Sequence, residues 1–370
     1  MKLYVIAGEA SGDLHGSNLM QAILDEQPQT EFRFWGGDKM IAVQDNCVKH
    51  IRDLAFMGFV EVLMNIRTIT KNMRFCKEDI LAYQPDAIVM IDYPGFNLRI
   101  AEWAKEQGIK VIYYISPQVW AWKQNRVQKI KRVVDKMYVI LPFEKDFYKK
   151  FDYEVEYVGH PLLDEISKYD FESTREEFRK RNGLSDKPII ALVPGSRKQE
   201  VKTKLPIMVA ATKGMDEYQL VVAGAPSLTK EFYQSVQNDV QVVHGETYEL
   251  MYNATAALVT SGTATLETAL FKVPEVVCYK GSQISYSIAK RLVKVDYISL
   301  VNLIMGREVV KELIQKECNP DKIRAELDRL LNDEAYKSRL LADYDELQQK
   351  LGGGGASAKV AQSLLKTIEA

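Results

Sequence analysis

Apolar residues along the chain fall into short uninterrupted runs, separated by longer stretches that mix apolar and polar residues at helical spacing. Runs such as 87–91 (AIVMI) and 189–193 (IIALV) are apolar at every position, which is typical of parallel strands covered by helices on both faces. The pattern therefore predicts an α/β fold in which strands and helices alternate. We expect strands at 2–7, 32–36, 87–91, 111–115, 137–141, 155–158, 189–193, 218–223, 240–243, 256–260 and 276–279.

A polar and charged segment between residues 164 and 188 interrupts this alternation. A chain of 370 residues is long for a single core, so we interpret the interruption as a boundary between two domains. Each domain then repeats the strand–helix pattern of a Rossmann-like unit. The predicted organisation is an N-terminal domain at 1–165, a helical linker at 166–187, a C-terminal domain at 188–335 and C-terminal helices at 336–370.

The composition is that of an ordinary globular enzyme, with 46% hydrophobic residues, 27% charged residues and a net charge of −1. The near-zero charge argues against nucleic acid as the main partner. The four cysteines lack CxxC spacing and the four histidines lack the i, i+4 spacing of a helical metal pair, so we expect no metal and a reducing cytoplasm. No apolar run approaches the ~18 residues of a transmembrane helix. A protein that is soluble or peripheral to a membrane is expected.

Two strand–loop–helix turns in the C-terminal domain have the features of anion sites. In the first (IIALVPGSRKQEV), Ser196 is the expected N-cap and Arg197 follows in the first helical turn. In the second (SGTATLE), Gly262 and Thr263 leave N–H groups unobstructed, and Glu267 lies one turn inside the helix. Unpaired N–H groups and the helix dipole attract phosphate, and arginine adds a fork suited to it. The alternatives are ordinary turns with a solvated arginine and a helix-stabilising acid.

The N-terminal domain places a carboxylate at the end of a predicted strand. Asp92 follows the run at 87–91, and ligands of open α/β sheets bind beyond the carboxyl ends of the strands. Asp92 is therefore a candidate general base, with a turn-forming aspartate before Pro-Gly as an equal alternative. After the first strand, glycines in the predicted loop 8–13 (GEASGD) permit close approach of the backbone to a ligand. The loop matches neither the dinucleotide fingerprint nor a hydrolase nucleophile elbow.

Two further segments of the N-terminal domain are candidates for contact with a lipid. Segment 116–122 (SPQVWAW) leads two tryptophans into a basic helix at 123–132, and aromatic and basic side chains together suit an anionic headgroup. A solvated helix face is the alternative. The apolar cluster at 56–60 (FMGFV) either belongs to the core or contacts acyl chains.

A set of motifs runs in the same order through nearly the whole chain: GEASGD at 8–13, MGFVEVL at 57–63, DYPGFN at 92–97, SPQVWAW at 116–122, LPFEKDFY at 141–148, GHPL at 159–162, PGSR at 194–197, SGTATLE at 261–267 and SLVNLIMGREVVKELIQ at 299–315. Together they resemble the lipid-A-disaccharide synthase family. The tryptophan segment and the pairing of GEASGD with DYPGFN are specific, whereas SGTATLE is shared with other nucleotide-sugar enzymes. Gly95 departs from the pattern, because some members carry a second acid at that position.

The resemblance implies a GT-B fold, with two Rossmann-like domains, a central cleft and C-terminal helices that cross back to the first domain. It implies an inverting glycosyltransferase that needs no metal or other cofactor. The implied reaction moves 2,3-diacylglucosamine from UDP-2,3-diacylglucosamine to the 6-hydroxyl of 2,3-diacylglucosamine-1-phosphate (lipid X) and releases UDP, on the route to lipid A and lipopolysaccharide in Gram-negative bacteria. Such an enzyme would work as a peripheral protein on the cytoplasmic face of the inner membrane.

The resemblance also implies roles for individual residues. Asp92 would be the general base, and Arg197 would stabilise the leaving phosphate. The UDP-sugar would be held by Gly195, Ser196, Arg197, Ser261, Gly262, Thr263, Glu267 and Asn302. The acceptor would be held by Gly8, Glu9, Ser11, Gly12, Asp13, Asn97, Ser116 and Trp120. The lipid or membrane surface would be met by Met57, Phe59, Trp122, Lys123 and Arg126.

Other functions on the same architecture stay open at this point. The nearest is a UDP-N-acetylglucosamine 2-epimerase, for which His15 and His160 are available but which leaves the tryptophan–basic segment unexplained. A glycosyltransferase with a soluble acceptor and a non-catalytic binding protein are the others. The glycine run at 352–355 is a flexible break, which leaves room for a homodimer formed by exchange of the final helix.

Overall fold

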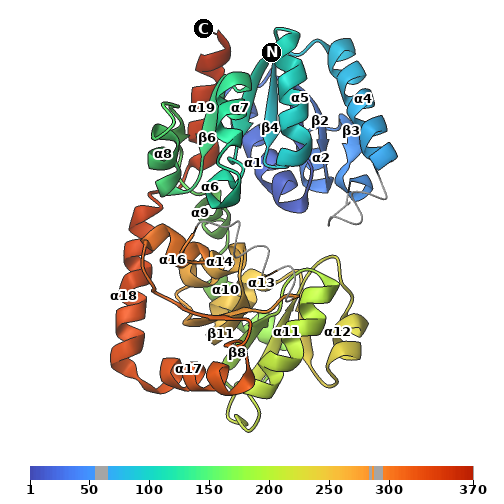
Figure 1. The fold of residues 1–370 in the computed structure, drawn as a ribbon. Coiled ribbons are helices and arrows are strands. Elements are labelled where there is room, and N and C mark those ends of the chain that lie inside the picture. Colours follow the sequence, from blue (N-terminus) through green and yellow to red (C-terminus); the bar gives the residue numbers. More distant parts are fainter. Residues whose placement is uncertain (55–65, 283–285, 287–294, 370) are drawn as a thin grey trace. The chain divides into compact units, whose positions relative to one another are not determined.

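The computed structural model describes residues 1–54, 66–282, 286 and 295–369, and these residues form two compact α/β units (Figure 1). The first unit contains Met1–Asp164 together with Gly353–Ala370, and the second contains Glu165–Gly352. The predicted pair of Rossmann-like units is confirmed, since each unit has its own parallel sheet and its own buried core.

The first unit is built on a parallel sheet with the strand order β3-β2-β1-β4-β5-β6-β7 among the described residues. Ala7 of β1 aligns with Ile91 of β4, and Ile91 aligns with Tyr114 of β5. The residues that follow these three strands therefore emerge at one edge of the sheet. The strands are β1 (Lys2–Ala7), β2 (Glu31–Gly36), β3 (Cys47–His50), β4 (Ala87–Ile91), β5 (Lys110–Tyr114), β6 (Lys136–Val139) and β7 (Glu156–Tyr157).

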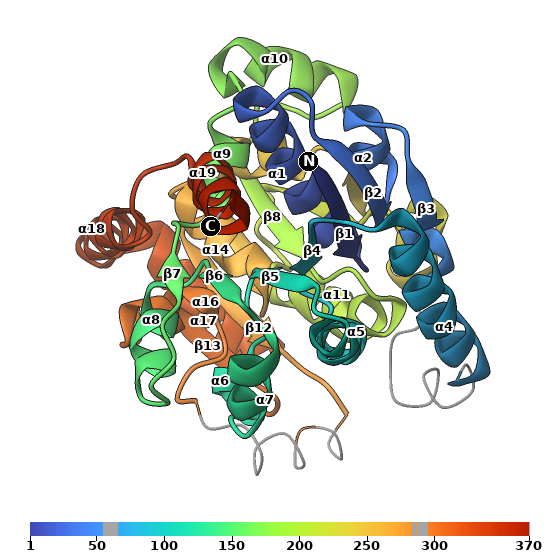
Figure 2. The same cartoon turned by 90° about the horizontal axis from the view of Figure 1, so that it is seen from above.

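Helices cover both faces of this sheet. On one face α1 packs against α2 and α19 (Figure 2). Leu19, Ile23, Val360 and Leu364 are buried there together with alternate strand residues. On the other face α4 contacts the sheet, where Asp79 accepts a hydrogen bond from Tyr4. The helices are α1 (Ala10–Glu26), α2 (Asp38–Val43), η1 (Ile51–Asp53), α4 (Ile66–Tyr83), α5 (Pro94–Glu106), α6 (Val119–Trp122), α7 (Arg126–Val133), α8 (Pro142–Lys149), α9 (Pro161–Ile166) and α19 (Ala356–Glu369).

The second unit repeats the design, with the parallel strand order β10-β9-β8-β11-β12-β13 in the described part of the chain. Helices α10 and α13 bury Phe178, Leu250 and Met251 on one face, and α11 and α17 contact each other on the other. The strands are β8 (Ile189–Val193), β9 (Gln219–Gly224), β10 (Gln241–His244), β11 (Ala254–Thr260), β12 (Glu275–Tyr279) and β13 (Lys311–Ile314). The helices are α10 (Phe171–Arg181), α11 (Lys198–Ala211), α12 (Lys230–Val236), α13 (Thr247–Asn253), α14 (Thr263–Leu270), α16 (Leu300–Met305), α17 (Pro320–Asn332) and α18 (Glu334–Lys350).

The predicted domain boundaries differ from the structure at the two ends of the second unit. Helix α18 packs against α14, α16 and α17 and so belongs to the second unit, with Tyr344 and Leu347 fully buried. Only α19 returns to the first unit, where it packs on α1 of the same chain; the homodimer stays a prediction. The segment 166–187 is not a free linker, because Phe178 of α10 belongs to the second core.

No helix in the described ranges is long and apolar enough to cross a bilayer.

Candidate functional site

A cavity of about 420 Å³ lies in the second unit at the carboxyl ends of β8, β9 and β11. Parallel strands carry their helix starts and loops at this edge, where ligands of open sheets bind. Both predicted anion sites contribute to it, one after β8 and one after β11. The predicted UDP-sugar residues that line the cavity are Gly195, Ser196, Arg197, Ser261, Gly262, Thr263 and Glu267.

Glu200, which the sequence analysis missed, closes the turn after β8. One carboxylate oxygen of Glu200 accepts hydrogen bonds from the N–H groups of Ser196 (3.2 Å) and Arg197 (3.4 Å). Gly195 has a φ of +115°, and a Cβ there would come within 2.3 Å of the same carboxylate. The N-cap of α11 is Arg197 rather than the predicted Ser196. This helix start is therefore occupied by an acid of its own chain, while the Arg197 side chain is 65% exposed.

The turn after β11 offers its N–H groups to the cavity. Gly262 is the N-cap of α14 with a φ of +140°, a conformation that favours glycine, and both Gly262 and Thr263 are exposed. The first N–H groups of a helix have no partner within it. Glu267 lies one turn further on and accepts a hydrogen bond from Tyr248 (3.4 Å). Burial raises the pKa of Glu267 to about 7, so this carboxyl is partly protonated near neutrality.

Asn302 does not reach this cavity, contrary to the prediction. Its side chain is fully buried, and its amide nitrogen donates to the carbonyl of Val310 and to Glu312, both at 2.9 Å. Its amide oxygen accepts from the N–H groups of Val309 (2.7 Å) and Val310 (3.0 Å). All four hydrogen-bonding positions of the amide are used, so Asn302 holds α16 against β13 instead of holding a nucleotide.

In the first unit, Asp92 lies at the sheet edge where β1, β4 and β5 end. Asp92 and Tyr93 have φ values of +44° and +49°, which non-glycine residues adopt only when their surroundings impose it. The Asp92 carbonyl accepts hydrogen bonds from Tyr113 (2.5 Å) and from Asn97 (2.8 Å). Its N–H donates to the carbonyl of Tyr114 (3.2 Å). These hydrogen bonds fix the backbone of Asp92, and the carboxylate remains its reactive group.

The environment of the Asp92 carboxylate suits a proton acceptor. Burial and, to a smaller extent, the negative charge of Glu9 raise the pKa of Asp92 to about 6, and the Tyr93 N–H partly offsets this rise. A base with a pKa just below the working pH is deprotonated yet still strong enough to accept a proton. Glu9 itself is exposed at the N-cap of α1. The sequence analysis predicts that Glu9 holds the acceptor. The structure adds that the negative charge of Glu9 raises the pKa of Asp92.

The segment 8–13 is mostly helical rather than a loop, since α1 begins at Ala10. Gly8 is required by a close approach, because a Cβ there would come within 2.3 Å of the Tyr93 ring. Ser11 is exposed on the first helical turn, and Gly12 is buried, where a Cβ would lie 3.1 Å from that of Ala7. Of the six residues, Glu9 and Ser11 present exposed polar side chains.

Asp13 and Asn97 have structural roles rather than the predicted contact with an acceptor. The buried Asp13 carboxylate accepts hydrogen bonds from the N–H groups of Gly37 (2.7 Å), Lys39 (3.1 Å) and Met40 (3.1 Å) at the start of α2. Asn97 is fully buried and its amide fixes the Asp92 carbonyl. The Asp13 carboxylate and the Asn97 amide nitrogen both bind backbone groups, so Asn97 positions Asp92 and Asp13 joins α1 to α2.

Replacement of Asp13 by alanine should therefore lower stability rather than chemistry. Three N–H groups would lose a charged acceptor in a buried place, and we expect the free energy of unfolding to fall by about 3 kcal/mol. Asp38→Ala at the exposed start of the same helix should cost less than about 1 kcal/mol. Urea unfolding of both variants measures these changes in the free energy of unfolding. Equal losses of free energy in the two variants would show that the Asp13 carboxylate is not the main support of α2.

The SPQVWAW segment divides into a buried part and an exposed part. Ser116 is buried and shares a hydrogen bond with the Tyr148 hydroxyl (2.6 Å). Trp120 is 6% exposed and packs edge-on against Phe143, with ring centroids 4.9 Å apart. The predicted acceptor contacts of Ser116 and Trp120 are therefore not supported, because both side chains pack inside the first unit. Nearby, burial raises the pKa of Glu144 to about 7.

Trp122, by contrast, is 49% exposed, and the Lys123 ammonium lies 4.0 Å from its ring centroid. Arg126 begins the basic helix α7 and is half-buried. The contact of these residues with a headgroup stays a prediction. Met57 and Phe59, the other two residues predicted for the lipid, lie outside the described residues.

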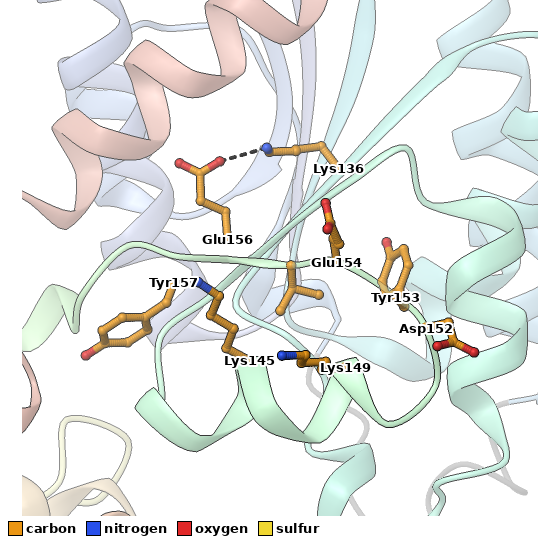
Figure 3. A pocket seen from close by; sticks show the side chains of 9 residues that line it. Lys136, Lys145, Lys149, Asp152, Tyr153, Glu154, Glu156 and Tyr157 are labelled. Atoms are coloured by element: carbon orange, nitrogen blue, oxygen red, sulfur yellow. Dashed lines mark ion pairs between the residues drawn. The ribbon is translucent and has the colours of Figure 1, made fainter.

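A second cavity, of about 810 Å³, lies in the first unit beside the edge strand β7. Figure 3 shows Lys145 and Lys149 of α8 on one side of it, and Lys136 in an ion pair with Glu156 (2.7 Å) on the other. The rest of its lining comes from the start of β6 and from the residues before and in β7. None of its lining residues directly follows the carboxyl end of a strand, so this cavity is not a candidate for the reaction.

The fold is shared with enzymes that act on sugar nucleotides and with glycosyltransferases. The UDP-GlcNAc 2-epimerase from Neisseria meningitidis superposes with a TM-score of 0.69 at 13% identity, covering 99% of this chain and 100% of that one. The calicheamicin glycosyltransferase CalG4 superposes with a TM-score of 0.60 at 15% identity, covering 100% of this chain and 98% of that one. Fold and strand-end sites together define a GT-B-type enzyme of two Rossmann-like units.

Comparison of sequences identifies the family of the chain more specifically than comparison of folds does. The model of the lipid-A-disaccharide synthetase family matches residues 3–363. The lipid-A-disaccharide synthase of Trichlorobacter lovleyi is 38% identical, over 100% of this chain and 98% of that protein. That of Syntrophus aciditrophicus is 40% identical, over 99% of this chain and 97% of that protein. The chain therefore belongs to the lipid-A-disaccharide synthase family, and it is a glycosyltransferase of lipid A biosynthesis.

Proposed function

We propose that the chain transfers 2,3-diacylglucosamine from UDP-2,3-diacylglucosamine to the 6-hydroxyl of lipid X, with inversion at the anomeric carbon and release of UDP. The match with lipid-A-disaccharide synthases over nearly the full length carries this choice of reaction. The donor is supported by the 420 Å³ cavity, which combines the exposed start of α14 with the side chains of Arg197 and Glu267. These groups suit a diphosphate and hydroxyl groups.

In this proposal Asp92 is the general base. It takes the proton of the acceptor 6-hydroxyl as the oxygen attacks the anomeric carbon from the face opposite UDP. Its raised pKa, its strained backbone and its place beyond the carboxyl end of β4 support the role. Exposed Glu9 and Ser11 are candidates to hold the acceptor sugar beside it.

The leaving UDP gains negative charge as the glycosidic bond breaks. The Arg197 guanidinium and the N–H groups at the start of α14 would stabilise that charge, so that the reaction proceeds without a metal ion. Glu267 would accept hydrogen bonds from the ribose. Its neighbour Tyr248 orients the carboxylate.

Because both proposed substrates carry acyl chains, the reaction would take place at a membrane surface. We propose that Trp122, Lys123 and Arg126 contact the anionic headgroup region of the cytoplasmic face of the inner membrane. The exposed Trp122 ring with the adjacent ammonium supports this peripheral contact.

An epimerase is the second candidate, because epimerases share the fold. One observation weighs against it. Burial lowers the pKa of His160 to about 3, and its Nδ1 accepts the N–H of Leu162 (3.2 Å), so this histidine is neutral and engaged at physiological pH. It is therefore a poor proton donor for epimerase chemistry.

Product analysis tests the proposal. The protein is incubated in detergent and EDTA with UDP-2,3-diacylglucosamine, with and without lipid X. We expect tetraacyl disaccharide 1-phosphate and UDP in equal amounts, only when lipid X is present. Interconversion of UDP-N-acetylglucosamine with its 2-epimer, and no disaccharide, would contradict the proposal in favour of the epimerase.

A further inference from the structure

Lys204 of α11 is a buried cation. It is 3% exposed, and its ammonium donates a hydrogen bond to the side-chain oxygen of Thr260. That hydroxyl in turn donates to the carbonyl of Cys278 (3.4 Å). Across the described ranges, no carboxylate lies within ion-pair distance of Lys204. An ammonium buried with one hydroxyl partner has a large desolvation cost, and burial accordingly lowers the pKa of Lys204.

The position of Lys204 connects it with the donor cavity. Thr260 is the last residue of β11 and lines that cavity, immediately before the Ser261–Gly262 turn. Lys204 lines a neighbouring hollow of about 280 Å³, and Glu200 lines both. The Glu200 side chain therefore borders both the hollow of the buried ammonium and the anion site.

Glu200 also carries the negative charge that partly balances the positive charges of Lys204 and Arg197. It precedes Lys204 by one helical turn, its negative charge is the main one that raises the pKa of Lys204, and its carboxylate covers the N–H groups at Ser196 and Arg197. A single carboxylate thus faces two cations, Lys204 and Arg197, at a site lined by helix starts. The arrangement has an excess of positive charge that a more highly charged anion would balance.

We propose that Lys204 strengthens the donor site from behind the strand-end turn, as a buried ammonium that raises the affinity for a diphosphate. The inference rests on the proposed donor site. The positive charge acts through Thr260 and the Ser261–Gly262 turn, in a part of the protein where low polarity strengthens electrostatic attraction. The cost of burying the ammonium is offset when UDP binds.

Calorimetric measurement of the affinity of the full chain for UDP and for UMP tests the proposed role of Lys204. Lys204→Met removes the charge and keeps the length, and Lys204→Gln removes the charge but keeps a donor for Thr260. The matched control is Lys202→Met, which removes the same charge from an exposed position of the same helix. We expect both Lys204 variants to bind UDP about tenfold more weakly, with a smaller loss for UMP, and to melt at or above the wild-type temperature. Lys202→Met should bind UDP as the wild type does.

The outcomes separate the inference from the proposed function. Wild-type affinity for UDP in Lys204→Gln, or equal losses in Lys202→Met and Lys204→Met, would overturn the role of the buried charge while the donor site stands. If Lys204→Met does not fold, Lys204→Gln decides the matter. Failure of the wild-type protein to bind UDP would instead refute the donor site itself.

Discussion

Asp92→Asn should lower kcat by about 10²- to 10⁴-fold, the range that general-base catalysis supplies. Asparagine keeps the size of the side chain and tolerates the left-handed backbone of residue 92 better than other residues do. The amide has no basic oxygen that can take a proton. The loss should therefore appear in the rate of disaccharide formation, measured in detergent at saturating substrates.

The same variant should leave the rest of the protein unchanged. The three hydrogen bonds that fix residue 92 use only its backbone, so the melting temperature and the affinity for UDP should match those of the wild type. An Asp92→Asn protein with wild-type kcat would remove Asp92 as the base and leave the family assignment intact. A folded variant that has lost UDP binding would assign Asp92 to a different role.

Arg197→Ala should lower kcat by about 10²- to 10³-fold, as expected when a donor to a developing negative charge is lost. The Arg197 side chain is 65% exposed and its ion pair with Glu200 is long (3.8 Å), so its removal should cost little stability. Lysine at this position keeps the charge but not the planar fork, and Arg197→Lys should recover only part of the rate.

The control for Arg197 is its neighbour. Lys198→Ala removes the same charge from the next residue, which is exposed on the first turn of α11. Its kcat should remain within about twofold of the wild type, because surface charges at this exposure contribute little. Equal losses in the two variants would mean that the general charge of α11, and not the Arg197 fork, supports the reaction.

The strand-end sites could be predicted from the sequence because uninterrupted apolar runs mark buried parallel strands. Once the strands are known, the residues after 91, 193 and 260 must emerge at the functional edges of their sheets. This reasoning found Asp92, Arg197 and Gly262. It found neither β13 nor α16, whose short segments carry no uninterrupted apolar run or clear period.

Polar residues with buried side chains were assigned wrongly, since local sequence does not reveal their partners. The partners of Asp13 lie 24 to 27 residues away, at the start of α2. Those of Asn302 lie across the turn into β13. Trp120 and Trp122 look alike in the sequence, and only packing separates the buried ring from the exposed one.

Charged residues inside helix α11 were also missed. Glu200 and Lys204 lie one turn apart in a segment with many charges, where a solvated face is the ordinary interpretation. Only the structure shows that one covers a helix start and that the other is buried behind it.

The pH dependence of kcat/KM, in wild type and in Glu9→Gln, tests most directly that Asp92 is the base. A base must be deprotonated to act, so wild-type kcat/KM should fall at low pH, with a limb from the titration of Asp92 at about 6, the pKa to which burial and the charge of Glu9 raise it. Glu9→Gln removes a neighbouring negative charge, so the pKa of Asp92 should fall and the midpoint should move to lower pH. The account would be contradicted if kcat/KM did not fall at low pH, or if Glu9→Gln did not move the midpoint of that fall.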